Sequence, residues 1–274
     1  MSIRPAWWMT LQALMMPLVN KMLRETRTTI FGKMAGWFTV PMLSGKNFNI
    51  TYLPIHYRIT DIGETLLPQA VLRELVRQSA HRAIIRRCTC RDGGKCGNHE
   101  VELGCLLLGE GAAEIDTGVS RHVSVDEALD HVDRCVESGL TPFAGRFKAD
   151  DYIWGVKDRG KLLTICFCCA CCCVIRKHLR YLPEVSQASV IRLKGLEIIT
   201  DPECCNSCGV CTDACFIEAR KIIDDKLVYD PSQCKGCGHC LSICPEKAVS
   251  ANVADIGDAV AEVWGRIDRL IDFR

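Results

Sequence analysis

Cysteine is the residue type in this sequence whose number and spacing could do chemistry. Twenty of the 274 residues are cysteine, and nineteen of them fall in three short stretches, at 88–105, 166–173 and 204–244. The chain is too long to resemble a small secreted disulfide scaffold, and the short spacings do not suit disulfide pairing. Soft thiolate ligands select zinc, copper(I) or iron–sulfur cores. We therefore expect bound metal and a reducing, cytoplasmic and anaerobic setting.

The strongest pattern is an internal repeat in the last third of the chain. Cys205-x2-Cys208-x2-Cys211-x3-Cys215 is followed, 29 residues later, by Cys234-x2-Cys237-x2-Cys240-x3-Cys244-Pro245. Zinc sites draw their ligands from two C-x-x-C pairs joined by a longer stretch, which this repeat does not match. The repeat therefore favours iron–sulfur clusters over zinc.

Across residues 203–250 this repeat resembles a bacterial ferredoxin with two [4Fe–4S] clusters. By that resemblance, three cysteines of each set hold one cluster and the fourth reaches the other. The resemblance implies two ligand sets: Cys205, Cys208, Cys211 and Cys244 for cluster one, and Cys234, Cys237, Cys240 and Cys215 for cluster two.

Several neighbours of these cysteines also carry information. Gly209, Gly236 and Gly238 permit backbone conformations that other residues resist, so amides can approach cluster sulfur. Phe216 stands where the family usually has proline, for which we expect only a local backbone change. Cys204 is interpreted as a spare thiol, because taking it as the first ligand in place of Cys205 would break the x2-x2-x3 spacing of the repeat.

A second system of ten cysteines lies in the middle of the chain. Its members are Cys88, Cys90, Cys96, Cys105, Cys166, Cys168, Cys169, Cys171, Cys172 and Cys173. Ten exceeds the eight ligands of two cubanes, so one or two further iron–sulfur clusters are expected and not every thiol should bind. A zinc or mixed site, redox-active thiols and a noncubane cluster remain open alternatives. His81, His99 and His122 are expected to be surface or hydrogen-bonding residues, and Arg91 to support a cluster.

Residues 50–250 also resemble uncharacterised 4Fe–4S binding proteins of anaerobic bacteria and archaea. The resemblance is carried by Cys88-Thr89-Cys90-Arg91, by the ELGC segment ending at Cys105, and by the run at 166–173. It supports cluster binding but implies no particular reaction.

The elements that must position these loops can be read from hydrophobic periodicity. Short apolar runs at 83–85 and 162–165 predict strands that each lead into a cysteine loop. Pro68 and an apolar stripe at Val71, Leu72, Leu75 and Val76 predict one helix. Ser124 and Glu127 form a capping box for another, which Gly139 ends and in which Cys135 is a buried apolar residue.

The two ends of the chain are predicted to be amphipathic helices. An apolar face at the start comprises Trp7, Trp8, Leu11, Leu14, Met15, Leu18, Val19 and Met22. It could pack on its own domain, or it could dock a partner or a membrane surface. The segment is too interrupted to span a bilayer, and no export signal is evident. The end of the chain repeats apolar residues from Ile256 to Ile271 at helical intervals.

These patterns predict a mixed α/β (α+β) fold with four parts. They are an apolar helical segment at 1–60, a cysteine-rich α/β iron–sulfur domain at 61–200, a two-[4Fe–4S] ferredoxin domain at 201–252 and an amphipathic helix at 253–274. The hydrophobic content of 48% is ordinary for a globular protein.

Composition and missing motifs exclude several classes of function. Lys plus Arg total 34 and Asp plus Glu total 33, so the sequence lacks the basic excess of a general nucleic-acid binder. It contains no GxGxxG loop, no Walker P-loop and no evident acid–base pair.

We expect an iron–sulfur electron carrier, or the subunit of an oxidoreductase, that exchanges electrons with a partner oxidoreductase. The alternative is a redox enzyme in which the middle cysteines hold a substrate-binding cluster fed by the ferredoxin pair. The expected location is cytoplasmic, with the N-terminal helix docking a partner protein or the cytoplasmic face of the membrane.

Overall fold

The computed structural model describes residues 4–53, 67–157 and 160–274. Its centre is a six-stranded antiparallel sheet in the order β1-β5-β6-β3-β2-β4. The strands are β1 (Phe48–Tyr52), β2 (Arg82–Ile85), β3 (Leu106–Leu108), β4 (Ser120–His122), β5 (Thr141–Phe147) and β6 (Leu163–Cys168). The predicted mixed fold is confirmed, as are the predicted strands at 83–85 and 162–165.

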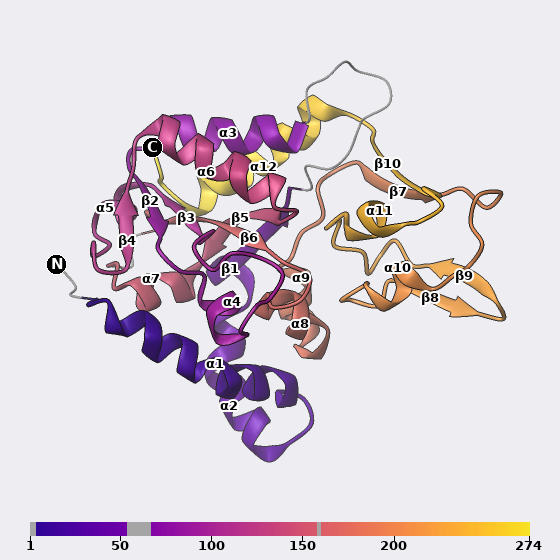
Figure 1. Ribbon diagram of the computed structural model, residues 1–274, viewed down its shortest axis with the longest axis horizontal. Coiled ribbons are helices and arrows are strands. Elements are labelled where there is room, and N and C mark those ends of the chain that lie inside the picture. Colours follow the sequence, from indigo (N-terminus) through magenta and orange to yellow (C-terminus); the bar gives the residue numbers. More distant parts are fainter. Residues whose placement is uncertain (1–3, 54–66, 158–159) are drawn as a thin grey trace.

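Three helices cover one face of this sheet (Figure 1). They are α3 (Leu67–Gln78), α6 (Val125–Glu137) and α12 (Ile256–Leu270). Ser124 caps α6 through the predicted capping box with Glu127, and Gly139 follows its end with φ +79°. Cys135 is fully buried in the core beneath these helices, as predicted. The predicted C-terminal helix is therefore part of the main core.

The opposite face carries α1 (Trp7–Glu25), with α2 (Ile30–Met42) next to it (Figure 1). A short turn joins the two helices, and a Cβ atom on Gly32 would lie 1.9 Å from the carbonyl oxygen of Glu25. Only a glycine allows this approach.

The predicted apolar face of α1 packs only in part, through the half-buried Trp8 and Val19. Met9, Met16 and Leu23 are the buried residues of this helix, whereas Trp7 and Leu14 are largely exposed. None of the helices in the described part of the chain is both long and apolar enough to cross a membrane.

Shorter helices connect the strands and carry the cysteine loops. They are α4 (Thr89–Gly93), α5 (Glu110–Ala113), α7 (Lys148–Trp154), α8 (Val174–His178) and α9 (Glu184–Ala188), with 3-10 turns at Gly45–Asn47 and Leu179–Tyr181. The loop at 88–105 follows β2, and the run at 166–173 begins inside β6. Both cysteine stretches are therefore anchored on strands of the same sheet.

Residues 196–253 form a smaller unit beside the main sheet (Figure 1). Strand β7 (Leu196–Thr200) pairs antiparallel with β10 (Val249–Val253), and β8 (Arg220–Ile223) forms a hairpin with β9 (Lys226–Tyr229). Two short helices, α10 (Val210–Asp213) and α11 (His239–Ile243), lie between these strands in the chain.

The predicted domain boundaries at 60, 200 and 252 stay predictions. Two pairings do cross them: β1, from the N-terminal segment, pairs with β5 of the middle unit, and β7 pairs with β10.

Candidate iron–sulfur and metal centres

The internal repeat in the sequence produces two equivalent local structures. Gly209 has φ +81° and caps the start of α10, and Gly238, 29 residues later, has φ +76° and caps the start of α11. This left-handed conformation favours glycine, and it turns the chain sharply between the second and third cysteine of each set.

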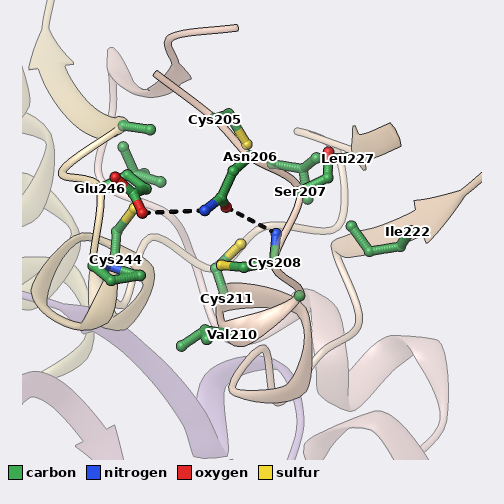
Figure 2. Close-up of a pocket in the computed structure, with 14 residues that line it drawn as sticks. Cys205, Asn206, Ser207, Cys208, Val210, Cys211, Ile222, Leu227, Cys244 and Glu246 are labelled. Atoms are coloured by element: carbon green, nitrogen blue, oxygen red, sulfur yellow. Dashed lines mark hydrogen bonds between the residues drawn. The ribbon is translucent and has the colours of Figure 1, made fainter. Parts of the chain in front are cut away.

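Cys205, Cys208, Cys211 and Cys244 line one small hollow (Figure 2). The Asn206 side chain links two sides of this hollow. It accepts a hydrogen bond from the Cys208 amide at 3.1 Å and donates one to the Glu246 carboxylate at 3.1 Å. Cys244 comes from the second repeat, so the hollow is built from both halves of the unit.

A second hollow is lined by Cys215, Cys234, Cys237 and Cys240, with Cys211 at its edge. The structure thus brings together each set of four cysteines that the ferredoxin resemblance implies. The assignment of each thiol to a particular cluster stays a prediction.

The position of Arg220, which lines the second hollow, shows whether this hollow suits an anionic cluster. Its side chain is buried, its Nη1 lies 3.9 Å from the Cys211 sulfur, and its Nη2 has no hydrogen-bond partner among the described residues. A buried cationic donor without a partner is costly unless an acceptor is bound. Cluster sulfur held by thiolates would supply that acceptor, so these residues fit the group.

Residues 197–245 match the family of the 4Fe–4S dicluster domain. This segment of the chain holds two [4Fe–4S] clusters. A search of curated proteins and a search of solved structures each found no match to the chain. We refer to residues 197–245 as the dicluster domain.

The dicluster domain meets the rest of the protein at Phe216, the position where we expected only a local change. The Phe216 ring lies 6.0 Å from the ring of Tyr52 on β1, and the Arg176 guanidinium of α8 lies 5.2 Å from the Phe216 ring. The sequence pattern missed this contact because neither Tyr52 nor Arg176 belongs to a motif.

Tyr52 and Arg176 are also buried polar residues. The Tyr52 hydroxyl and the Nε and Nη2 atoms of Arg176 have no hydrogen-bond partner among the described residues. Electrostatically, Arg176 faces Cys237 of the dicluster domain on one side and Cys168 and Cys173 of the middle unit on the other. A single buried cation therefore lies between the two cysteine systems.

The ten middle cysteines divide into two groups. Seven of them line a cavity of about 430 Å³ between the sheet and the helices α1 and α2. Six belong to the cavity alone, namely Cys88, Cys90, Cys105, Cys166, Cys168 and Cys173, whereas Cys169 also belongs to the second group. We call this the six-thiol cavity. Away from the thiols it is lined by apolar residues of α1 and α2, including Met15, Met22 and Phe38.

The thiols of this cavity lie in close pairs. The sulfur of Cys105 is 3.0 Å from that of Cys166, and the sulfur of Cys168 is 2.8 Å from that of Cys173. A hydrogen bond from Cys90 lowers the pKa of Cys88 to about 6, against the effect of burial. This hydrogen bond favours the thiolate form of Cys88, the form that binds metal.

One carboxylic acid in the cavity was missed by the sequence analysis. Asp150 on α7 is buried, lines the cavity and accepts a hydrogen bond from the Thr164 hydroxyl at 2.7 Å. Burial is the main cause that raises its pKa to about 7. No motif surrounds Asp150, so only the folded structure reveals this buried carboxylic acid in the cavity wall.

The other four middle cysteines converge on one point. Cys96, Cys169, Cys171 and Cys172 place their sulfur atoms within 4.8 Å of one another, and such a group can hold a metal ion. This all-cysteine site adjoins the cavity, since Cys169 also lines the cavity wall, and we call it the four-thiol set.

Arg91 supports the loops that carry both groups of middle cysteines. Its guanidinium is buried and donates to the carbonyl oxygens of Glu100, Leu103 and Phe167. These bonds tie the 88–105 loop to β6.

The remaining residues of interest lie outside these groups. Cys204 is exposed. His99 bonds the Ser138 hydroxyl and His122 bonds the carbonyl oxygen of Ile115, which fits the hydrogen-bonding roles expected of them.

Replacing Cys205 should distinguish it from its neighbour Cys204. The Cys205→Ser variant is expected to lose about four iron atoms per chain, since a cubane lacking one thiolate is poorly held. Iron and sulfide analysis of anaerobically purified protein measures this loss. Cys204→Ser is the matched control and should keep its full iron content. Loss of iron in Cys204→Ser but not in Cys205→Ser would contradict the assignment of Cys205 as the first ligand.

Proposed function

We propose that this protein transfers electrons between its dicluster domain and a redox centre in the six-thiol cavity. When bound, the two [4Fe–4S] clusters supply one-electron donors and acceptors. The observation that carries the proposal is the buried contact of Tyr52, Arg176 and Phe216, which joins the two cysteine systems. The protein would act as an electron carrier or as a subunit of a larger oxidoreductase.

Within the dicluster domain the cysteines would bind across the two repeats. Cys205, Cys208, Cys211 and Cys244 would hold one cluster, and Cys234, Cys237, Cys240 and Cys215 the other. The lining of the two hollows supports this arrangement. It keeps the two clusters side by side, so that either can exchange electrons with the other.

In the cavity, thiolates from two loops would hold one further iron–sulfur cluster. The six thiols exceed the four that a cubane requires. Either the spare thiols would donate hydrogen bonds to a cubane, or the cavity would hold a larger or noncubane cluster. The low pKa of Cys88 and the position of Arg176 beside Cys168 and Cys173 support an anionic centre here.

Redox titration tests the function directly. Protein purified anaerobically should show reversible reduction of bound clusters by low-potential donors, followed by EPR spectroscopy. Irreversible or absent reduction would contradict electron transfer.

The same redox titration, carried out on a variant of Arg176, tests the role of this residue. Removing a buried positive charge disfavours the reduced, more negative state, so Arg176→Met should lower the reduction potential of the neighbouring cluster. The expected shift is roughly 60 mV, equivalent to about 1.4 kcal/mol for one electron. Arg180→Met removes an exposed charge nearby and should leave the potential unchanged; an equal shift in both variants would contradict a specific role for Arg176.

We also propose that α1 and α2 dock the protein on an anionic membrane surface. Large apolar side chains on α2 remain exposed, with Ile30 at 81% and Trp37 at 78%. Residues 4–47 carry six basic residues and one acidic residue, Glu25. Apolar and basic groups together are typical of helices that lie in the headgroup region. In the cell this would be the cytoplasmic face, where thiols stay reduced.

A vesicle sedimentation assay tests this docking. The full protein should bind vesicles containing phosphatidylserine more tightly than neutral vesicles, and Trp37→Ser with Ile30→Ser should reduce binding at least tenfold. Ile223→Ser, an exposed apolar residue of the dicluster domain, serves as the control. Equal binding of all variants would overturn the proposal, and binding only to a redox partner protein would assign the surface to that partner instead.

A second candidate function is favoured by the size of the six-thiol cavity. Its volume falls within the range of small-molecule sites, and its apolar end reaches α1 and α2. An apolar acceptor of quinone type could enter there and take up two electrons and two protons. Asp150 could deliver one of the protons.

Menadione reduction under anaerobic conditions, with a low-potential donor, tests this candidate. Because Asp150 must be protonated to donate, the rate should fall as pH rises through about 7. Asp150→Asn should lower the rate at least tenfold and abolish this pH dependence. A rate independent of both changes would leave the cavity without a substrate role.

A further inference from the structure

The four-thiol set has a geometry of its own. The sulfurs of Cys96, Cys169, Cys171 and Cys172 all lie within 4.8 Å of one another, and those of Cys96 and Cys171 are 3.6 Å apart. Four thiolates at about 2.3 Å from one tetrahedral zinc ion would stand about 3.8 Å from one another. We propose that this set holds a single Zn²⁺ ion and takes no part in an iron–sulfur cluster.

The dicluster domain provides the comparison within the same chain. In a cubane each thiolate binds a different iron atom, so the sulfurs surround a cube and stand farther apart than ligands of one ion. In the part of the chain that the structure describes, the four-thiol set is the one group of three or more Cys, His, Asp or Glu side chains that converges within 4.8 Å. The eight cysteines of the two hollows do not converge in this way.

The local backbone supports bound thiolates at this position. The amide of Cys172 donates a hydrogen bond to the Cys169 sulfur at 3.2 Å, which stabilises negative charge on that sulfur. Gly94 leaves room for the set, because a Cβ atom there would lie 3.1 Å from the Cys172 sulfur and 2.8 Å from the Cys90 carbonyl oxygen. Cys169 is 2% exposed and Cys172 9% exposed, so their charge would require a cation.

All four positions around the ion would be filled by protein sulfur, which is typical of a structural zinc site. The ion would connect the 88–105 loop, through Cys96, to the turn after β6. That turn also carries Cys168 and Cys173 at its two ends, and both line the six-thiol cavity. Zinc would therefore fix the wall of the cavity without exchanging electrons.

Metal analysis of the full-length protein tests this inference. Anaerobically purified protein, expressed with zinc and iron supplied, should contain about one zinc per chain. X-ray absorption at the zinc edge should show a first shell of four sulfurs at about 2.3 Å. Cys171→Ser should lose that zinc and keep its iron.

Two control variants distinguish loss of zinc from loss of the iron–sulfur clusters on which the proposed electron transfer depends. Cys105→Ser, in the cavity, should lose iron and keep zinc, and Cys204→Ser should keep both. The inference is overturned if the wild-type protein lacks zinc, if the zinc shell contains nitrogen or oxygen in place of sulfur, or if Cys171→Ser loses iron and sulfide. The absorption measurement uses the unaltered protein, so it decides the matter even if a variant does not fold.

Discussion

Side chains on a β-strand alternate between the two faces of a sheet, and this constraint divides the cysteine run at 166–173. Cys166 and Cys168 point toward α1, whereas Phe167 and Cys169 belong to the core beneath α3, α6 and α12. A continuous run of thiols therefore cannot gather at one centre. The alternation in β6 directs Cys166 and Cys168 to the six-thiol cavity, and the turn that follows the strand carries Cys169, Cys171 and Cys172 to the four-thiol set beside it.

Much of the fold and of the dicluster domain could be predicted from the sequence because the relevant signals are local. The capping box at Ser124, the strand leading to Cys166 and the repeat from Cys205 to Cys244 each depend on residues within a short span. The match of residues 197–245 to the dicluster family agrees with the pattern of that repeat.

The partition of the middle cysteines could not be predicted, since it depends on long-range packing. Cys96 joins Cys169 across more than seventy residues, and nothing near either one specifies the other. The contact of Phe216 with Tyr52 likewise requires that β1 be placed next to the dicluster domain. For α1, periodicity identified the helix but only part of its packed face, because the face used depends on the shape of the sheet beneath it.

The pairing of β7 with β10 means that the dicluster domain leaves the main body and returns to it at adjacent points. Helix α12 follows at once and covers the sheet through Ala259, Val263 and Ile267. The pairing closes a long loop, residues 201–248, and closing a loop of this length costs conformational entropy. Cluster insertion, which couples metal binding to folding, would offset that cost. Binding of the clusters would therefore also favour the β7–β10 pairing from which α12 continues into the central core.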